Sequence, residues 1–251
     1  MKYAGLDIGS RTIELVIIED GKVVESKQAD TGFDPLKQAQ TLLDGVKHDR
    51  LMATGYGRHL AADAFGAATV TEIKAYAVGA RSIFPEARAI LDIGGQDSKA
   101  ISLDQAGNIL KFEMNDRCAA GTGKFLEIMA HALGYSMEQF GPAALQGKGA
   151  LAINSMCTVF AESEVISLIA RNEKRENIAQ ALHQTIVKRA LAMIKRVGLH
   201  QPLFFAGGVA RNVCVHQLLE RMIANAVLVP EEPQMTGALG AAWIAAMNEK
   251  K

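Results

Sequence analysis

The sequence has no excess of charge of either sign and few of the residues that mark secreted or membrane proteins. Its 251 residues carry 27 Lys and Arg against 27 Asp and Glu, so no overall field would recruit nucleic acid or an anionic membrane surface. The longest apolar stretches, such as residues 237–247, are shorter than the roughly 20 residues that span a bilayer, and the amino terminus lacks a signal-peptide core. Three cysteines are too few, and odd in number, for a disulfide framework. We therefore expect a soluble protein of the reducing cytoplasm, with no nucleic-acid or membrane partner.

What the sequence does have is an internal repeat. The stretch YAGLDIGSRTIEL, which begins at Tyr3, returns as AILDIGGQDSKAI, which begins at Ala89. Strand-like and helical stretches also alternate along the chain, so we expect an α/β fold with two similar domains that face each other across a cleft. The expected strands are 3–8, 13–18 and 22–28 in the first copy and 89–93, 98–103 and 109–113 in the second, with turns around Gly21 and Gly107.

Each copy ends its first strand in Asp-Ile-Gly. Gly9 and Gly94 lack the Cβ that would keep a phosphate away from the backbone N–H groups of the turn, and the hydroxyls of Ser10 and Thr12 can add hydrogen bonds. A third glycine pair follows an apolar strand in LFFAGGVARN, residues 203–212. One such turn could be no more than a tight turn after a strand. Two in matched hairpins predict a phosphate-binding site in the cleft.

These three stretches resemble the phosphate and adenosine loops of the actin-like ATPase superfamily, which includes sugar kinases and Hsp70 chaperones. The resemblance covers essentially the whole chain and implies duplicated actin-like (ribonuclease H-like) α/β domains, with mixed sheets flanked by helices and a nucleotide in the interdomain cleft. It implies a first domain at residues 1–85, a second at 86–229 and a C-terminal helix within 230–251 that returns to the first. The residues that it implies bind ATP or ADP are Gly9, Ser10, Arg11, Thr12, Gly94, Gly95, Lys99, Gly207, Gly208, Arg211 and Asn212.

The same resemblance implies three catalytic residues. Asp7 would hold Mg²⁺ through its water shell, and either Gln96 or Asp97 would orient the attacking water. A carboxylate or an amide suits that role, because phosphoryl transfer depends on alignment and charge stabilisation more than on covalent chemistry. The alternative is that Asp7 and Asp92 only accept hydrogen bonds from turn amides.

Two of the three cysteines occur in matching contexts. CAAGTGKF, which begins at Cys118, is not a P-loop, because the pattern needs Gly at 118 and Ser or Thr at 125. Cys118 and Cys157 each lie three residues after an asparagine and ahead of a helical pattern, where a thiolate is stabilised for metal ligation. Either of them alone could be a small core residue. Cys214 has no such counterpart, and we interpret it as ordinary packing within a helix.

Two thiolates are half of the usual ligand set of an iron–sulfur cluster or a structural zinc site. No CxxC spacing supplies the rest, and His131 or His183 would be arbitrary substitutes. A two-fold homodimer, in which each subunit contributes Cys118 and Cys157, would complete the set on the symmetry axis.

Four stretches together give a narrower resemblance. DIGGQDSK, NDRCAAGTGKFLE, CTVFAESEV and TGALGAA look like the activators of 2-hydroxyacyl-CoA dehydratases, a branch shared with the ATPase subunits of benzoyl-CoA reductase. The resemblance implies a homodimer with one [4Fe–4S] cluster between the subunits, held by Cys118 and Cys157. It also implies ferredoxin or flavodoxin as electron donor and a dehydratase-type enzyme as acceptor of a low-potential electron. Because the helices after the cysteines belong to the same domain as DIGGQDSK, closure on ATP would change their mutual angle and the surroundings of the cluster.

Three alternatives predict different observations. A subunit of a benzoyl-CoA reductase-like complex would copurify with its partners, a small-molecule kinase would need no metal beyond magnesium, and a zinc-linked dimer would be colourless. One more stretch, ATGYGRHL at residues 53–60, we interpret as a glycine-rich surface loop, with contact of Arg58 or His59 to a partner as the alternative.

Overall fold

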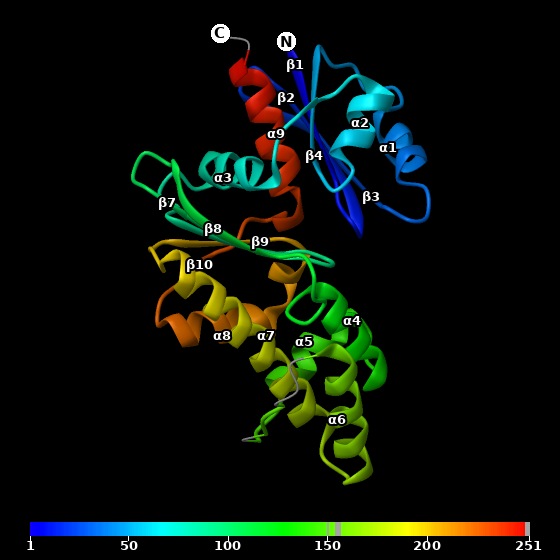
Figure 1. Ribbon diagram of the computed structural model, residues 1–251, viewed down its shortest axis with the longest axis vertical. Coiled ribbons are helices and arrows are strands. Elements are labelled where there is room, and N and C mark those ends of the chain that lie inside the picture. The colour runs from blue at the N-terminus through cyan, green and yellow to red at the C-terminus, as the bar shows by residue number, and fades with distance from the viewer. Residues whose placement is uncertain (150, 154–156, 249–251) are drawn as a thin grey trace.

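The computed structural model describes residues 1–149, 151–153 and 157–248, and two five-stranded sheets form its framework (Figure 1). The first sheet has the order β3-β2-β1-β4-β5, with β1 (Lys2–Ile8), β2 (Thr12–Glu19), β3 (Lys22–Asp30), β4 (Arg50–Gly55) and β5 (Ala68–Thr69). The second has the order β10-β9-β6-β7-β8, with β6 (Ala89–Ile93), β7 (Ser98–Leu103), β8 (Ile109–Asn115), β9 (Leu203–Ala206) and β10 (Val227–Leu228). Both sheets are mixed, because β1 and β6 each pair with one antiparallel and one parallel neighbour.

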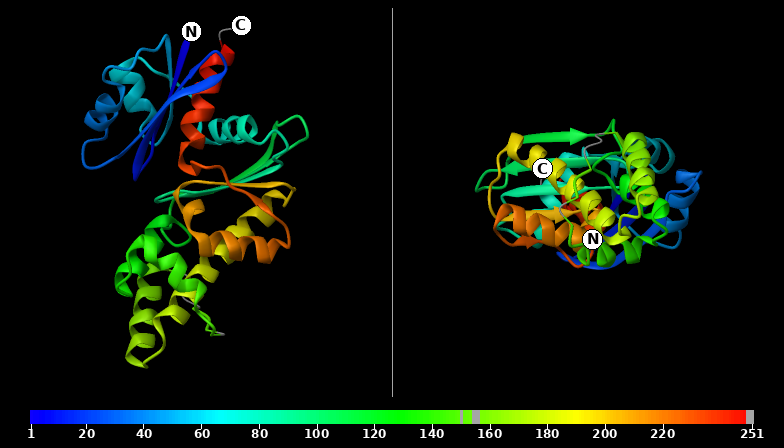
Figure 2. Two further views of the ribbon diagram at one scale, coloured as in Figure 1. Left: turned by 180° about the vertical axis from the view of Figure 1, so that it is seen from behind. Right: turned by 90° about the horizontal axis from the view of Figure 1, so that it is seen from below.

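Helices cover both faces of each sheet. In the described residues they are α1 (Pro35–Leu43), α2 (Arg58–Phe65), α3 (Glu72–Ile83), α4 (Gly123–Ala132), α5 (Met137–Leu145), α6 (Thr158–Ala170), α7 (Arg175–Val197), α8 (Val213–Ile223) and α9 (Thr236–Met247). Helices α1 and α2 pack on one face of the first sheet and α7 and α8 on one face of the second, while α3 and α9 lie between the sheets. Helix α6 lies at the opposite end of the molecule from the N-terminus (Figure 2). Within this described part, no helix is both long and apolar enough to cross a membrane.

The two sheets share one topology, which confirms the predicted duplication. The six predicted strands correspond to β1 to β3 and β6 to β8. The first hairpin turns at Asp20 and Gly21, both in the left-handed region with φ of 51° and 75°, as an Asp-Gly pair predicts. The structure places β4 and β5 beside β1. In the equivalent places beside β6 it has β9, which is the apolar strand predicted in LFFAGGVARN, and β10. The duplicated unit is therefore a complete five-stranded sheet.

Close contacts between backbones explain the small residues of the C-terminal helix. A Cβ on Gly5 of β1 would lie 1.9 Å from the carbonyl oxygen of Ala238 in α9, and one on Gly240 would lie 1.8 Å from the carbonyl oxygen of Ala75 in α3. Both distances are far inside van der Waals contact, so only glycine allows α9 to approach β1 and α3 so closely. The TGALGAA stretch is thus a packing surface for both elements.

Helix α3 contributes to the core of both halves. Tyr76 and Ala80 pack with Ile90 of the second sheet, whereas Ala75 packs with Tyr3 of the first sheet and with α9. Helices α3 and α9 therefore form a shared layer between the sheets. The domain limits at residues 1–85 and 86–229, with the 230–251 helix assigned to the first domain, remain our proposal for dividing this layer.

Candidate functional site

A cavity of about 450 Å³ lies between the two sheets, a size suited to a small-molecule ligand. All but one of the residues predicted to bind nucleotide or catalyse its hydrolysis line it: Asp7, Gly9, Ser10, Arg11, Thr12, Gly94, Gly95, Asp97, Lys99, Gly207, Gly208, Arg211 and Asn212. Gln96 is the exception, because its side chain is exposed outside this lining. The structure thus brings together residues from both repeats and from the LFFAGGVARN stretch, while their individual roles remain predictions.

The two Asp-Ile-Gly turns have the same backbone geometry and touch each other. The Gly9 N–H donates to the Thr12 carbonyl at 3.0 Å, and the Gly94 N–H donates to the Asp97 carbonyl at the same distance. A Cβ on Gly95 would lie 2.6 Å from the Cβ of Arg11. The two hairpins therefore meet across the cavity, and the absence of side chains at the glycines leaves room at their tips.

A second matched pair of glycines packs against the aspartates that precede the two turns. Gly55 ends β4 with φ of 86° and Gly207 follows β9 with φ of 80°. Added Cβ atoms would lie 2.4 Å from Oδ1 of Asp7 and 2.5 Å from Oδ1 of Asp92, respectively. Gly55 is thus the first-half counterpart of the predicted adenosine loop. Our interpretation of ATGYGRHL as a surface loop is wrong at this position.

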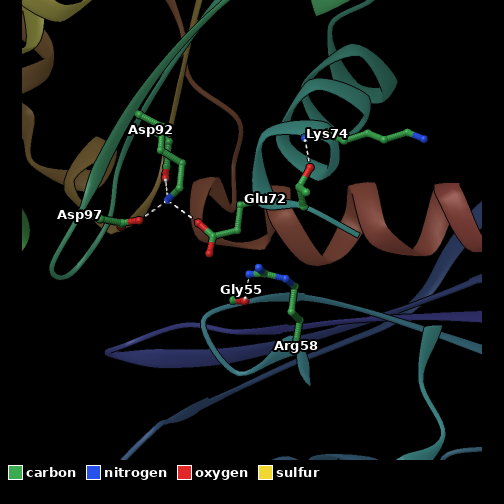
Figure 3. A network of polar contacts seen from close by, with 8 residues as sticks. Gly55, Arg58, Glu72, Lys74, Asp92 and Asp97 are labelled. Carbon is green, nitrogen blue, oxygen red and sulfur yellow. Dashed lines mark hydrogen bonds and ion pairs between the residues drawn. The ribbon is translucent and has the colours of Figure 1, made fainter. Parts of the chain in front are cut away.

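Arg58, from the same stretch, has a structural partner. Its Nη1 donates to the Gly55 carbonyl at 3.1 Å and so holds the turn (Figure 3). Tyr56, in contrast, is exposed while it also lines the cavity. The side chain of this stretch that is presented to a ligand is therefore a tyrosine.

Buried carboxyl groups gather at the ends of the first strands. Asp7 of β1 lies opposite Glu14 of β2 in the strand register, and both are buried. Burial, together with the charge of Glu14, raises the pKa of Asp7 well above its ordinary value, and burial raises the pKa of Glu14 to about 7. Oε1 of Glu14 and Oδ1 of Asp92 have no hydrogen-bond partner in the described residues. These oxygens fit a hydrated divalent cation, which would satisfy and neutralise them.

Sequence reasoning missed Glu14, although a signal was present. It stands between Ile13 and Leu15 in a strand that is buried on both faces, where a charged residue is costly. Such a residue in an otherwise apolar central strand indicates a functional site.

We predict that Glu14→Gln stabilises the nucleotide-free protein in a pH-dependent way. The folded protein keeps a proton on Glu14 up to about pH 7, whereas the unfolded chain loses it near 4.5, so Glu14 lowers stability as the pH rises through that window. Glutamine removes this cost. The free energy of unfolding, measured with urea in magnesium-free buffer, should exceed that of the wild type by about 3 kcal/mol at pH 8 and by little at pH 4.5. Equal stabilisation at both pH values would mean that charge is not the cause.

Lys99 lies at the centre of an ion cluster. Its ammonium is 2.5 Å from Oδ2 of Asp97, 2.8 Å from Oε2 of Glu72 and 3.1 Å from Oδ2 of Asp92, and these carboxylates converge on it from β6, its following turn and α3 (Figure 3). Burial opposes the charge on Lys99, but the three carboxylates outweigh it and raise its pKa well above the ordinary value. Lys99 lines the cavity as predicted, and its charge neutralises acids of the protein.

The far end of the cavity combines an apolar wall with a fixed asparagine. Oδ1 of Asn212 accepts hydrogen bonds from the N–H groups of Cys214 and Val215 and so caps α8, while its Nδ2 lies 3.0 Å from Nε2 of His183. His183 is fully buried, and burial lowers its pKa to about 4, so its neutral ring accepts from Asn212. His183 therefore binds Asn212 of the LFFAGGVARN stretch and is no substitute for a metal ligand. The neighbouring wall is formed by α5 and the start of α8 through Met137, Glu138, Gly141, Pro142 and Val213.

Cys118 and Cys157 are free and exposed, whereas Cys214 is buried as predicted. Cys157 is the residue before the first turn of α6, as expected, and its carbonyl accepts from Ala161. The asparagine that precedes it, at position 154, lies outside the described residues. Cys118 differs from the expectation, because it precedes α4 by a loop of several residues that the Asn115 side chain holds through the Cys118 carbonyl at 2.9 Å. The described residues contain no cluster of three potential metal ligands.

The N-terminus of α4 is joined directly to the turn at Gly94 and Gly95. The N–H groups of Gly123 and Lys124, the first two residues of α4, donate to the carbonyls of Gly94 and Gly95 at 2.9 and 2.8 Å. These are the donors that would otherwise be free at a helix start. The turn that lines the cavity and the helix that follows Cys118 therefore share one backbone hydrogen-bond network.

The chain has the actin-like fold, which it shares with a solved dehydratase activator that holds ADPNP and, at lower identity, with a sugar kinase. The model of the BadF/BadG/BcrA/BcrD ATPase family matches residues 4–245. The chain belongs to this family.

Relatives with known names extend over the whole chain. The activator of lactoyl-CoA dehydratase from Anaerotignum propionicum is 41% identical over 98% of this chain and 97% of its own. One of the subunits of benzoyl-CoA reductase from Thauera aromatica is 31% identical over 98% of this chain and 94% of its own. A solved structure, the activator of the 2-hydroxyisocaproyl-CoA dehydratase from Clostridium difficile with bound ADPNP, has a TM-score of 0.90 at 38% identity and covers 100% of this chain and 97% of that one.

Proposed function

We propose that the chain is an ATP-hydrolysing activator that passes a low-potential electron to a 2-hydroxyacyl-CoA dehydratase-type enzyme. The observation that carries the proposal is the backbone link between the phosphate turn at Gly94 and Gly95 and the helix that follows the exposed Cys118. Hydrolysis of ATP by itself does not require exposed cysteines such as Cys118 and Cys157. A free thiol at Cys118, ahead of a helix that is bound to the turn lining the cavity, is explained if nucleotide binding acts on a group that the thiol holds.

The thiols fit half of a [4Fe–4S] cluster shared between two subunits. Cys118 and Cys157 are both accessible, and α4 and α6, the helices that follow them, contact each other. Helix α6 also exposes apolar side chains, among them Val159 at 66% and Phe160 at 67% of their surface. Such a patch marks an interaction surface, and a two-fold dimer would cover it while bringing together four thiols. When bound, the cluster would supply one-electron chemistry, with ferredoxin or flavodoxin as the donor.

The cavity residues fit the binding and hydrolysis of ATP. The glycine turns at Gly9 and Gly94 would hold phosphates through backbone N–H groups, and Asp7 would hold Mg²⁺ through its water shell. Between the two candidates for orienting the attacking water, Asp97 lines the cavity and Gln96 does not, so we assign the role to Asp97. The apolar wall of α5 and the Gly207 loop would hold the adenosine. We expect the protein to act in the cytoplasm.

The proposal is tested by anoxic purification followed by measurement of iron, acid-labile sulfide and native mass. We expect a brown homodimer with about four irons per dimer and with ATP hydrolysis that needs magnesium. A colourless, iron-free protein from strictly anoxic cells that still hydrolyses ATP would overturn the electron-transfer function and leave the ATPase. A stable complex with other subunits would instead favour a benzoyl-CoA reductase-like assembly, to which the Thauera aromatica relative points.

A further inference from the structure

The first phosphate turn carries an arginine that is already bound to an acid. Nε of Arg11 lies 3.1 Å from Oε1 of Glu127 in α4, and Oε2 of the same carboxylate lies 3.2 Å from the ammonium of Lys124. Arg11 and Glu127 both line the cavity between the sheets. The Glu127 carboxylate is thus paired with the cations Arg11 and Lys124 at a cavity whose glycine turns suit a phosphate group.

This placement creates a direct competition with a bound polyphosphate. A phosphate group at the glycine turns carries more negative charge than a carboxylate, and a guanidinium can bind two of its oxygens at once. The side chains of Arg11 and Glu127 are 60% and 30% exposed, so their ion pair is weak enough for a ligand to displace.

We propose that Glu127 holds Arg11 while the cavity lacks nucleotide and releases it to the nucleotide phosphates. Glu127 then sets nucleotide affinity without touching the nucleotide itself, and it acts as a positioning residue. This inference rests on the proposed function only in that the cavity takes ATP or ADP. It does not depend on the cysteines or on iron.

The location of Glu127 gives the exchange a second consequence. The Arg11–Glu127 pair joins the first hairpin to α4, whose first two N–H groups are bound to Gly94 and Gly95 of the second hairpin. Release of Arg11 therefore removes a link between the first half of the molecule and α4 while the link to the second half stays. Occupation of the cavity by phosphate would in this way change how α4 is held.

The test is the dissociation constant of Mg–ADP and of a non-hydrolysable ATP analogue, measured by calorimetry on the anoxic protein. Glu127→Gln should bind both about two- to five-fold more tightly than the wild type, because the arginine no longer has to leave a charged partner. Asp30→Asn is the matched control. Asp30 is the other acid beside Arg11, at 3.8 Å from its Nη1, and it does not line the cavity.

Two results would overturn the proposal. The first is unchanged or weaker binding in Glu127→Gln, or an equal gain in Asp30→Asn, which would show a general charge effect. The second comes from the Arg11→Gln background. Competition requires that Glu127→Gln gives no gain there, whereas a full gain would show simple repulsion of the ligand. A wild-type protein that binds neither nucleotide would instead contradict the proposed function, so the two failures are distinguishable.

Discussion

Replacing Cys118 or Cys157 by serine is expected to remove the bound iron from the anoxically purified protein while leaving magnesium-dependent ATP hydrolysis largely intact. Each substitution would take two of the four thiolates from the proposed cluster site between two subunits, and a hydroxyl is a poor ligand for iron–sulfur clusters. The cavity is formed by other residues, so nucleotide turnover does not require the thiols. The measurements are iron and sulfide per dimer, the visible spectrum, and phosphate release.

Cys214→Ala provides the matched control for the serine variants. Cys214 is 1% exposed, and burial raises the pKa of its thiol to about 12, so it is a packing residue in α8 and no ligand. The alanine variant should keep its iron and its colour. If Cys118→Ser retains the full iron content, or if Cys214→Ala loses it, the assignment of the ligands is wrong.

Lys99→Met is expected to cost the largest amount of stability of any single change in the cavity. The substitution leaves the buried Asp92 and Asp97 and the half-buried Glu72 without their common cation, and breaking a buried ion pair typically costs about 3–5 kcal/mol. We also expect ATP hydrolysis to be abolished, because Asp97 loses the partner that fixes its orientation. The measurements are the free energy of unfolding in urea at pH 7.5 and the rate of phosphate release.

Lys74→Met is the control for the lysine variant. Lys74 lies on the exposed side of α3, two residues after Glu72, and its side chain points away from the cluster (Figure 3). Its replacement should change stability by less than about 0.5 kcal/mol. Adding Asp92→Asn to Lys99→Met should recover part of the lost stability without restoring hydrolysis. A Lys99→Met protein as stable as the wild type would mean that the three carboxylates do not need the ammonium.

Most of the fold could be predicted from the sequence, because each copy of the duplicated segment supports the structure predicted for the other. Two copies of a hairpin with the same turn residues predict the same structure twice, and central strands with nearly continuous apolar runs are readily recognised. The strand β9 was predicted from its apolar run, but its counterpart β4 was not. Their equivalence follows from the parallel pairing of β4 with β1 and of β9 with β6, and the left-handed backbone at Gly55 and Gly207 is visible only once the strands are side by side.

The site was predicted well where backbone chemistry dictates it and poorly where side chains from different elements meet. The glycine turns are local, so their sequence identifies them. The partners of Lys99 come from β6, from the turn after it and from α3, and no spacing along the chain reveals that Glu72 reaches the same ammonium. The sequence also did not distinguish Gln96, which is exposed outside the cavity, from Asp97, which lines it. The loop between Cys118 and α4 shows a similar limit, because a helical pattern does not fix the residue at which the helix begins.

The close packing of α9 has a consequence for the order in which the molecule is made. Helix α9 is synthesised after every other helix and strand of the described residues, yet its backbone fills the face of the first sheet at Gly5. The strands β1, β2 and β4 emerge from the ribosome early and must keep that apolar face uncovered until residues 236–247 are released. The half of the protein that is translated first is therefore the last to complete its core, and nascent chains would depend on chaperones or on the neighbouring half to protect it.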